Sequence, residues 1–170
     1  RKNYVDYLAH RPRVEKIGEH GLFTDEGEPV VLGQVQNQVA DHKGIVWTHV
    51  ISLRREDAAR LGYDSAVQWM ALLRSKRAML CKHMKIDSAN LKWYAAFHNE
   101  SHHPHVHLLV YSVKDGEGYL TKQSIEAMRS ELAHDIFRQD FANIYEEQAQ
   151  SRMDLKERSE VVMKTWIDEI

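Results

Sequence analysis

The chain has 170 residues, of which 43% are hydrophobic and 28% are charged, as in an ordinary globular protein. This length fits one domain with a single good core, and no apolar run approaches the ~20 residues that a membrane span needs. The net charge of -2 argues against a general polyanion binder, and the single cysteine, Cys81, fits a reducing cytoplasm rather than a disulfide scaffold.

The first part of the chain predicts two short helices separated by a long loop. Residues 3–10 form the first helix, which ends at Arg11-Pro12 because a residue before proline avoids the α region. Residues 13–33 hold five glycines or prolines and predict a loop, of a length more typical of a functional segment than of a simple connection. Residues 34–42 predict the second helix.

A strand and two helices are expected next. Residues 45–53 are rich in β-branched and apolar side chains, which favours a strand. Residues 54–61 predict a short helix that stops at Gly62. Asp64 or Ser65 then caps an amphipathic helix of roughly twenty residues.

Two adjacent strands and a long helix complete the pattern. The strands cover residues 91–98 and 103–113, and Thr121 caps a helix that runs to about Gln150. Residues 151–170 are highly charged and helical in pattern.

This order of elements predicts an α+β protein with a largely antiparallel sheet and helices packed on one face of it. We expect a single domain over residues 1–150 and a charged C-terminal helical extension over residues 151–170.

Five of the 11 histidines fall within residues 98–107, and three of them have the spacing of a metal site. Because side chains alternate across a strand, His105 and His107 share one face, while the apolar residues between and after them form the core face. If the two strands pair as a hairpin, His98 lies beside them. Three imidazoles without a fourth protein ligand leave open positions on an ion, as catalytic sites do. Glu100, in the turn, is a candidate to orient a ligand imidazole.

These histidines resemble the metal motif of HUH endonucleases, and most closely that of conjugative relaxases of the mobilisation (Mob) type. In that family a His-x6-His-hydrophobic-His motif follows an N-terminal tyrosine motif. This chain has both, with Tyr4 and Tyr7 one turn apart ahead of the histidines. The resemblance extends from Tyr4 to about Gln150. It implies a HUH relaxase-like fold, related to ferredoxin-like and palm folds, with a metal at the centre of the sheet and the tyrosine on a neighbouring helix.

The resemblance implies a metal-dependent DNA relaxase of conjugation and plasmid mobilisation, which nicks single-stranded DNA at an origin of transfer. The implied cofactor is a divalent ion that binds the scissile phosphate, and Mn or Mg is expected before Zn, Ni or Co. A tyrosine hydroxyl then attacks phosphorus, leaving a 5′-phosphotyrosine intermediate and a free 3′-hydroxyl. Tyr7 matches the family motif better, and Tyr4 is the alternative nucleophile. Accessory DNA-binding proteins and a coupling protein are the implied partners.

Four further residues are candidates for DNA contact. Arg11 and Arg13 follow the tyrosine helix and suit backbone phosphates. Tyr94 and Tyr111 share the predicted histidine face and suit stacking on bases.

Three other functions fit parts of the pattern. Rolling-circle replication initiators place the tyrosine after the histidines, where this chain offers only Tyr145, flanked by acidic residues that repel phosphate. A metal-dependent hydrolase that activates water needs no tyrosine nucleophile. A non-enzymatic metal-binding or DNA-binding module is the third alternative.

Overall fold

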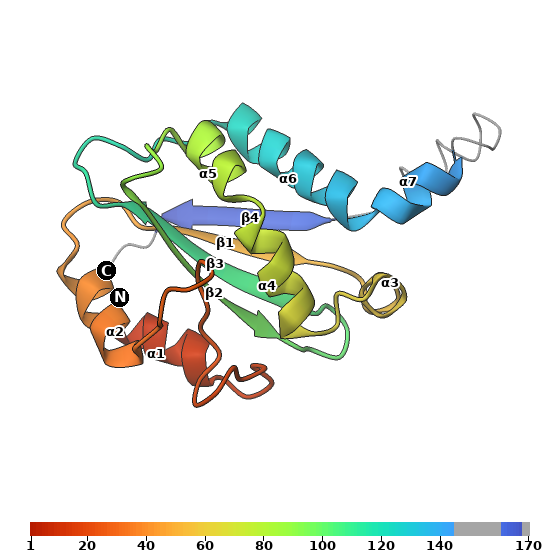
Figure 1. Ribbon diagram of the computed structural model, residues 1–170, viewed down its shortest axis with the longest axis horizontal. Helices are drawn as coiled ribbons and strands as arrows, with labels where there is room; N and C mark the ends of the chain where they lie inside the picture. The colour runs from red at the N-terminus through yellow and green to blue at the C-terminus, as the bar shows by residue number, and fades with distance from the viewer. Residues whose placement is uncertain (145–160, 168–170) are drawn as a thin grey trace.

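A computed structural model describes residues 1–144 and 161–167, in which a four-stranded antiparallel sheet lies between two groups of helices (Figure 1). The expected α+β class and antiparallel sheet are therefore confirmed. The strands run in the order β2-β3-β1-β4. Their bounds are Trp47–Ser52 (β1), Leu91–His98 (β2), His105–Ser112 (β3) and Val162–Ile167 (β4). The helices are Lys2–His10 (α1), Leu32–Asp41 (α2), Arg55–Leu61 (α3), Ala66–Arg74 (α4), Arg77–Met84 (α5), Lys122–Ile136 (α6) and Arg138–Ile144 (α7).

The β2–β3 hairpin forms the centre of the molecule and sets the positions of the histidines. His98 is opposite His105, and Ala96 is opposite His107. On its other side β3 pairs with β1, where Val50 is opposite His107. Because directly opposite residues of antiparallel strands point to the same face, all three histidines lie on one side of the sheet.

Both faces of the sheet are covered, which corrects the expectation of helices on one face. On one face, strand residues such as Trp93 and Phe97 pack with apolar side chains of α4, α5 and α6. On the histidine face, α1 and α2 bury a second cluster that includes Leu8, Val35 and Leu109. Figure 1 shows α5 and α6 along one side of the sheet, with α1 and α2 on the other.

The C-terminal extension is a strand where it is described. The expectation of a helix over residues 151–170 is wrong for Val162–Ile167, which form β4 and pair with the whole length of β1. Met163 packs against the large apolar cluster, so β4 contributes to the core of the sheet. Residues 145–160 and 168–170 lie outside the described residues, and Tyr145 is among them.

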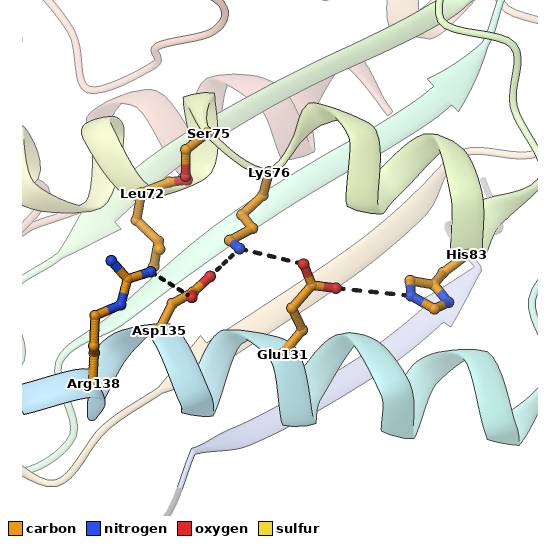
Figure 2. Close-up of polar contacts among 7 residues, drawn as sticks. All are labelled: Leu72, Ser75, Lys76, His83, Glu131, Asp135 and Arg138. Atoms are coloured by element: carbon orange, nitrogen blue, oxygen red, sulfur yellow. Dashed lines mark hydrogen bonds and ion pairs between the residues drawn. The ribbon is translucent and has the colours of Figure 1, made fainter. Parts of the chain in front are cut away.

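The helix expected to run for roughly twenty residues is divided into α4 and α5. At the break, the hydroxyl of Ser75 donates to the carbonyl of Leu72 (2.5 Å). Lys76, the next residue, forms ion pairs with Glu131 and Asp135 of α6, as Figure 2 shows. The break therefore places a cation between two carboxylates and ties the helix pair to α6. Within the described residues, no helix is long and apolar enough to span a membrane.

Candidate metal centre and tyrosine pair

Three imidazoles from the end of β2 and the start of β3 form a compact cluster. His98, His105 and His107 each offer a ring nitrogen, and these atoms lie within 4.8 Å of one another. The ring centroids are 4.5 to 5.3 Å apart. His98 and His107 are buried and His105 is half-buried, so the cluster opens to solvent on the side of His105.

Each histidine has one ring nitrogen held by the protein. His98 Nε2 is 3.2 Å from the carbonyl of Leu8, and His105 Nδ1 is 3.0 Å from the carbonyl of His103. A carbonyl only accepts, so both of these nitrogens carry the proton. His107 Nδ1 is 3.4 Å from the hydroxyl of Tyr4.

The opposite ring nitrogens are the ones available to a metal ion. His98 Nδ1 and His107 Nε2 are buried without a hydrogen-bond partner. Burying a polar atom in this way is costly unless something binds it. Metal-ligating histidines characteristically donate their other N–H to a carbonyl or a similar acceptor. The donor set and its orphaned nitrogens therefore fit a metal ion.

Burial keeps the cluster in the form that binds metal. Desolvation lowers the pKa of His98 to about 4 and that of His107 to about 3, and it also lowers the pKa of His105. The three imidazoles are therefore neutral at pH 7. A neutral imidazole has the free lone pair that coordination requires.

Helix α1 carries both candidate tyrosines next to the cluster. Its buried face, which includes Leu8, anchors it on the sheet, while the rings of Tyr4 and Tyr7 stack with centroids 6.3 Å apart. Tyr4 is half-buried and contacts His107. Tyr7 is 47% exposed, and the guanidinium of Arg11 lies 5.4 Å from its ring centroid. Tyr7 therefore presents its ring to solvent beside Tyr4, which is the tyrosine that contacts the histidine cluster.

Glu100 contacts arginines. It forms ion pairs with Arg11 (3.4 Å) and Arg13 (3.6 Å). The expectation that Glu100 orients a ligand imidazole is not met here, because Leu8, His103 and Tyr4 hold the second nitrogens of the triad. The backbone N–H of Asn99 donates to the carbonyl of Arg13 (2.9 Å), which fixes the arginine segment beside the hairpin.

Tyr94 and Tyr111 are core residues, which corrects the expectation that they face DNA. They do share the histidine face, but α1 and α2 cover this part of it and leave their side chains only 7% and 4% exposed. The hydroxyl of Tyr94 donates to Gln38 of α2 (3.3 Å), and the ring of Tyr111 contacts that of His42. A base could stack on either ring only after α2 had moved away.

Arg55 holds the hairpin that carries the three histidines, a role that its sequence position did not indicate. Its guanidinium donates to Asn99 Oδ1 (2.8 Å) and to the carbonyls of Glu100 and Ser101. The sequence alone indicates only that Arg54 and Arg55 are two surface cations after a strand. The carbonyls of Glu100 and Ser101 come within reach of Arg55 only because the hairpin folds over the start of α3.

The fold thus places a candidate metal centre of three histidines beside a helix that carries two tyrosines. The family model of MobL relaxases matches residues 4–169, and the chain belongs to this family. Comparisons with curated proteins and with solved structures gave no match.

Proposed function

We propose that this relaxase nicks single-stranded DNA at an origin of transfer by metal-dependent attack of a tyrosine on the scissile phosphate. One observation carries the proposal. Three imidazoles with free ring nitrogens lie on the same side of the sheet as the helix that bears Tyr4 and Tyr7. A candidate metal site and a candidate nucleophile are thus neighbours on one face of the sheet.

His98, His105 and His107 are the residues that would hold the ion. An all-imidazole donor set suits zinc, nickel or cobalt best. Mn²⁺ and Mg²⁺ both prefer oxygen ligands, and of these two Mn²⁺ accepts imidazole nitrogen more readily. When bound, such an ion polarises a phosphoryl oxygen and stabilises the charge that develops there.

We assign the nucleophile to Tyr7 and a positioning role to Tyr4. The hydroxyl of Tyr4 lies 3.4 Å from Nδ1 of His107, and it accepts the Nδ1–H in the tautomer that leaves Nε2 free for an ion. Tyr7 is the exposed member of the pair. In the reaction the Tyr7 oxygen bonds phosphorus and releases its proton, while the bond from phosphorus to the 3′ oxygen breaks and that oxygen takes up a proton. The products are a 5′-phosphotyrosine and a free 3′-hydroxyl, and the ester keeps the bond ready for rejoining.

Arg11 and Arg13 are the proposed phosphate contacts. They lie at the same opening as Tyr7, and both are paired with Glu100. Partly exposed ion pairs of this kind contribute little stability. A DNA phosphate therefore competes with Glu100 for either guanidinium at low cost.

A covalent-adduct assay tests the proposal. Labelled single-stranded oligonucleotides that tile the origin of transfer are incubated with the protein and Mn²⁺, and adducts that survive SDS are counted. We expect an adduct with the wild type and with Tyr4→Phe, and none with Tyr7→Phe or His105→Ala. An adduct lost only in Tyr4→Phe would transfer the nucleophile to Tyr4. Cleavage that survives both tyrosine substitutions would indicate a nuclease that uses water.

A further inference from the structure

The histidine face of the sheet continues beyond the part that α1 and α2 cover. The outer strand β4 alternates between two faces of the sheet. Met163 packs against the large apolar cluster and Thr165 hydrogen-bonds to His49 of β1 on one face, whereas Val162, Lys164 and Trp166 lie on the other. Val162 is 38% exposed and Trp166 is 41% exposed, and Lys164 is exposed as well. Half of β4 therefore faces solvent from the same side of the sheet as the histidines.

The strand register fixes how this surface relates to the metal centre. Val50 of β1 is opposite His107 on one side and opposite Lys164 on the other. Neighbouring strands are about 4.8 Å apart, so the backbone of Lys164 lies about 10 Å from that of His107. Trp166 occupies the next row on the same face, opposite Thr48. Lys164 and Trp166 thus lie on the same face of the sheet as the histidine cluster, two strands away from it.

The chemistry of this surface suits a single-stranded nucleic acid. No residue of β1 or β4 is acidic, so a polyanion meets no repelling side chain on these strands. The ammonium of Lys164 can neutralise a backbone phosphate, and the exposed indole of Trp166 offers a flat face for a base. Cationic groups interleaved with aromatic rings are how proteins hold single strands without reading their sequence.

We propose that Lys164 and Trp166 bind the DNA strand next to the scissile phosphate, with Lys164 on a backbone phosphate and Trp166 stacked on a base. The assignment rests on the proposed function for the identity of the ligand. A protein partner fits less well, because lysine is depleted from the centres of protein interfaces and here it stands in the middle of the surface.

Two measurements on the intact protein test the surface directly, with labelled oligothymidylate as the probe. The first is fluorescence anisotropy at several salt concentrations. We expect Trp166→Thr to weaken binding roughly tenfold or more, by loss of one stacked base. Lys164→Gln is expected to weaken binding and to reduce the salt-dependence slope by about 1. Tyr119→Thr and Lys122→Gln, which change an exposed aromatic and an exposed lysine elsewhere, are matched controls with unchanged affinity.

The second measurement is tryptophan fluorescence of the wild type. It needs no substitution, so it remains informative even if a variant fails to fold. Trp69 and Trp93 are buried, and Trp47 is half-buried with its indole N–H bonded to Gly118, which leaves Trp166 as the indole that a base can reach. Oligothymidylate should quench the tryptophan fluorescence of the wild type. Absence of quenching together with unchanged affinity in both β4 variants would overturn the proposal.

The outcomes separate this inference from the proposed function. Adduct formation with unchanged binding in the β4 variants refutes the surface and leaves the nicking reaction intact. Binding that depends on Lys164 and Trp166 without any adduct supports the surface and refutes the covalent step. Dimerisation in sedimentation experiments that Trp166→Thr abolishes, with DNA binding unaffected, would assign the surface to a second copy of the chain instead.

Discussion

Hydrogen bonds to backbone carbonyls decide which nitrogen His98 and His105 offer at the candidate metal centre. Two of the second nitrogens are held by backbone carbonyls, of Leu8 and His103, which no side-chain substitution removes. The third, on His107, depends on the side chain of Tyr4. Tyr4 is therefore the position at which the outer contacts of the site can be tested by a single conservative change.

We expect Tyr4→Phe to weaken metal binding about tenfold, the lower end of the effect seen when an outer partner of a ligating histidine is lost. The change removes only the hydroxyl and leaves the ring to stack on Tyr7. Isothermal titration with Mn²⁺ measures the affinity, and Tyr7→Phe, which removes a hydroxyl outside this contact, is the control. Equal affinity in the two variants would show that Tyr4 has no part in orienting His107.

His49 makes the stability of the protein depend on pH. It lies in β1 with 1% exposure, and its Nδ1 is 2.7 Å from the hydroxyl of Thr165 in β4. Burial lowers the pKa of His49 to about 4 from its usual 6.5. A lowered folded-state pKa means that the neutral form is favoured by folding, so the stability is full above pH 6.5. It is lost as the pH falls from 6.5 toward 4.

The pKa difference of His49 corresponds to roughly 3 kcal/mol of unfolding free energy lost by pH 4. We therefore expect His49→Gln to make the decline in stability between pH 6.5 and pH 4 shallower, with the remaining decline due to His98 and His107, whose pKa values are also lowered. Urea unfolding followed by circular dichroism at several pH values measures this slope. A decline as steep in the variant as in the wild type would assign the pH dependence to other groups.

At the scale of elements, the hairpin between β2 and β3 is held from outside by the start of α3. The guanidinium of Arg55 serves one side-chain oxygen and two carbonyls of the hairpin, and the backbone N–H of Arg55 donates to His102 (3.1 Å). The turn that joins the two histidine-bearing strands thus relies on one side chain to satisfy several of its hydrogen-bond acceptors.

Replacing Arg55 by Gln is expected to lower the unfolding free energy by about 1 to 3 kcal/mol, because hairpin acceptors lose a charged donor. The affinity for Mn²⁺ should fall as well, since His98 and His105 flank the loosened turn. Arg55→Lys should restore stability and affinity only in part, because an ammonium lacks the planar fork of donors that a guanidinium has. Arg54→Gln is the matched control, since Arg54 forms a surface ion pair with Asp57. Thermal unfolding and Mn²⁺ titration give the two readouts.

At the scale of the whole molecule, the candidate metal centre lies where α1 meets the sheet. Its three histidines come from two strands, and the carbonyl that orients His98 comes from α1. The site therefore exists only in the folded chain, and an ion that binds it stabilises the whole fold.

We expect Mn²⁺ at a hundred times its Kd to stabilise the protein by about 2.7 kcal/mol, seen as a rise in Tm. His105→Ala should remove most of this rise. His103→Ala is the control: its side chain is exposed and outside the triad, and the carbonyl that it gives to His105 is retained. A rise that persists in His105→Ala would place the ion elsewhere.

The sequence alone determined the features that depend on local periodicity. The strand over residues 91–98 has the predicted bounds, and alternation along the next strand placed His105 and His107 on one face with His98 beside them. The helix with the two tyrosines follows from its position before Arg11-Pro12. These features are readable because each is set by neighbours in the chain.

Only the tertiary structure decided what covers each face and which distant segments meet. Local pattern favoured a helix over residues 162–167, whereas pairing with β1 makes them a strand. The second helical layer buries Tyr94 and Tyr111, although alternation had placed them on the histidine face as predicted. Arg55 acquires its role from a turn more than forty residues away in the chain. Contacts between distant residues depend on the packing of the whole chain, which the spacing of residues within a segment does not encode.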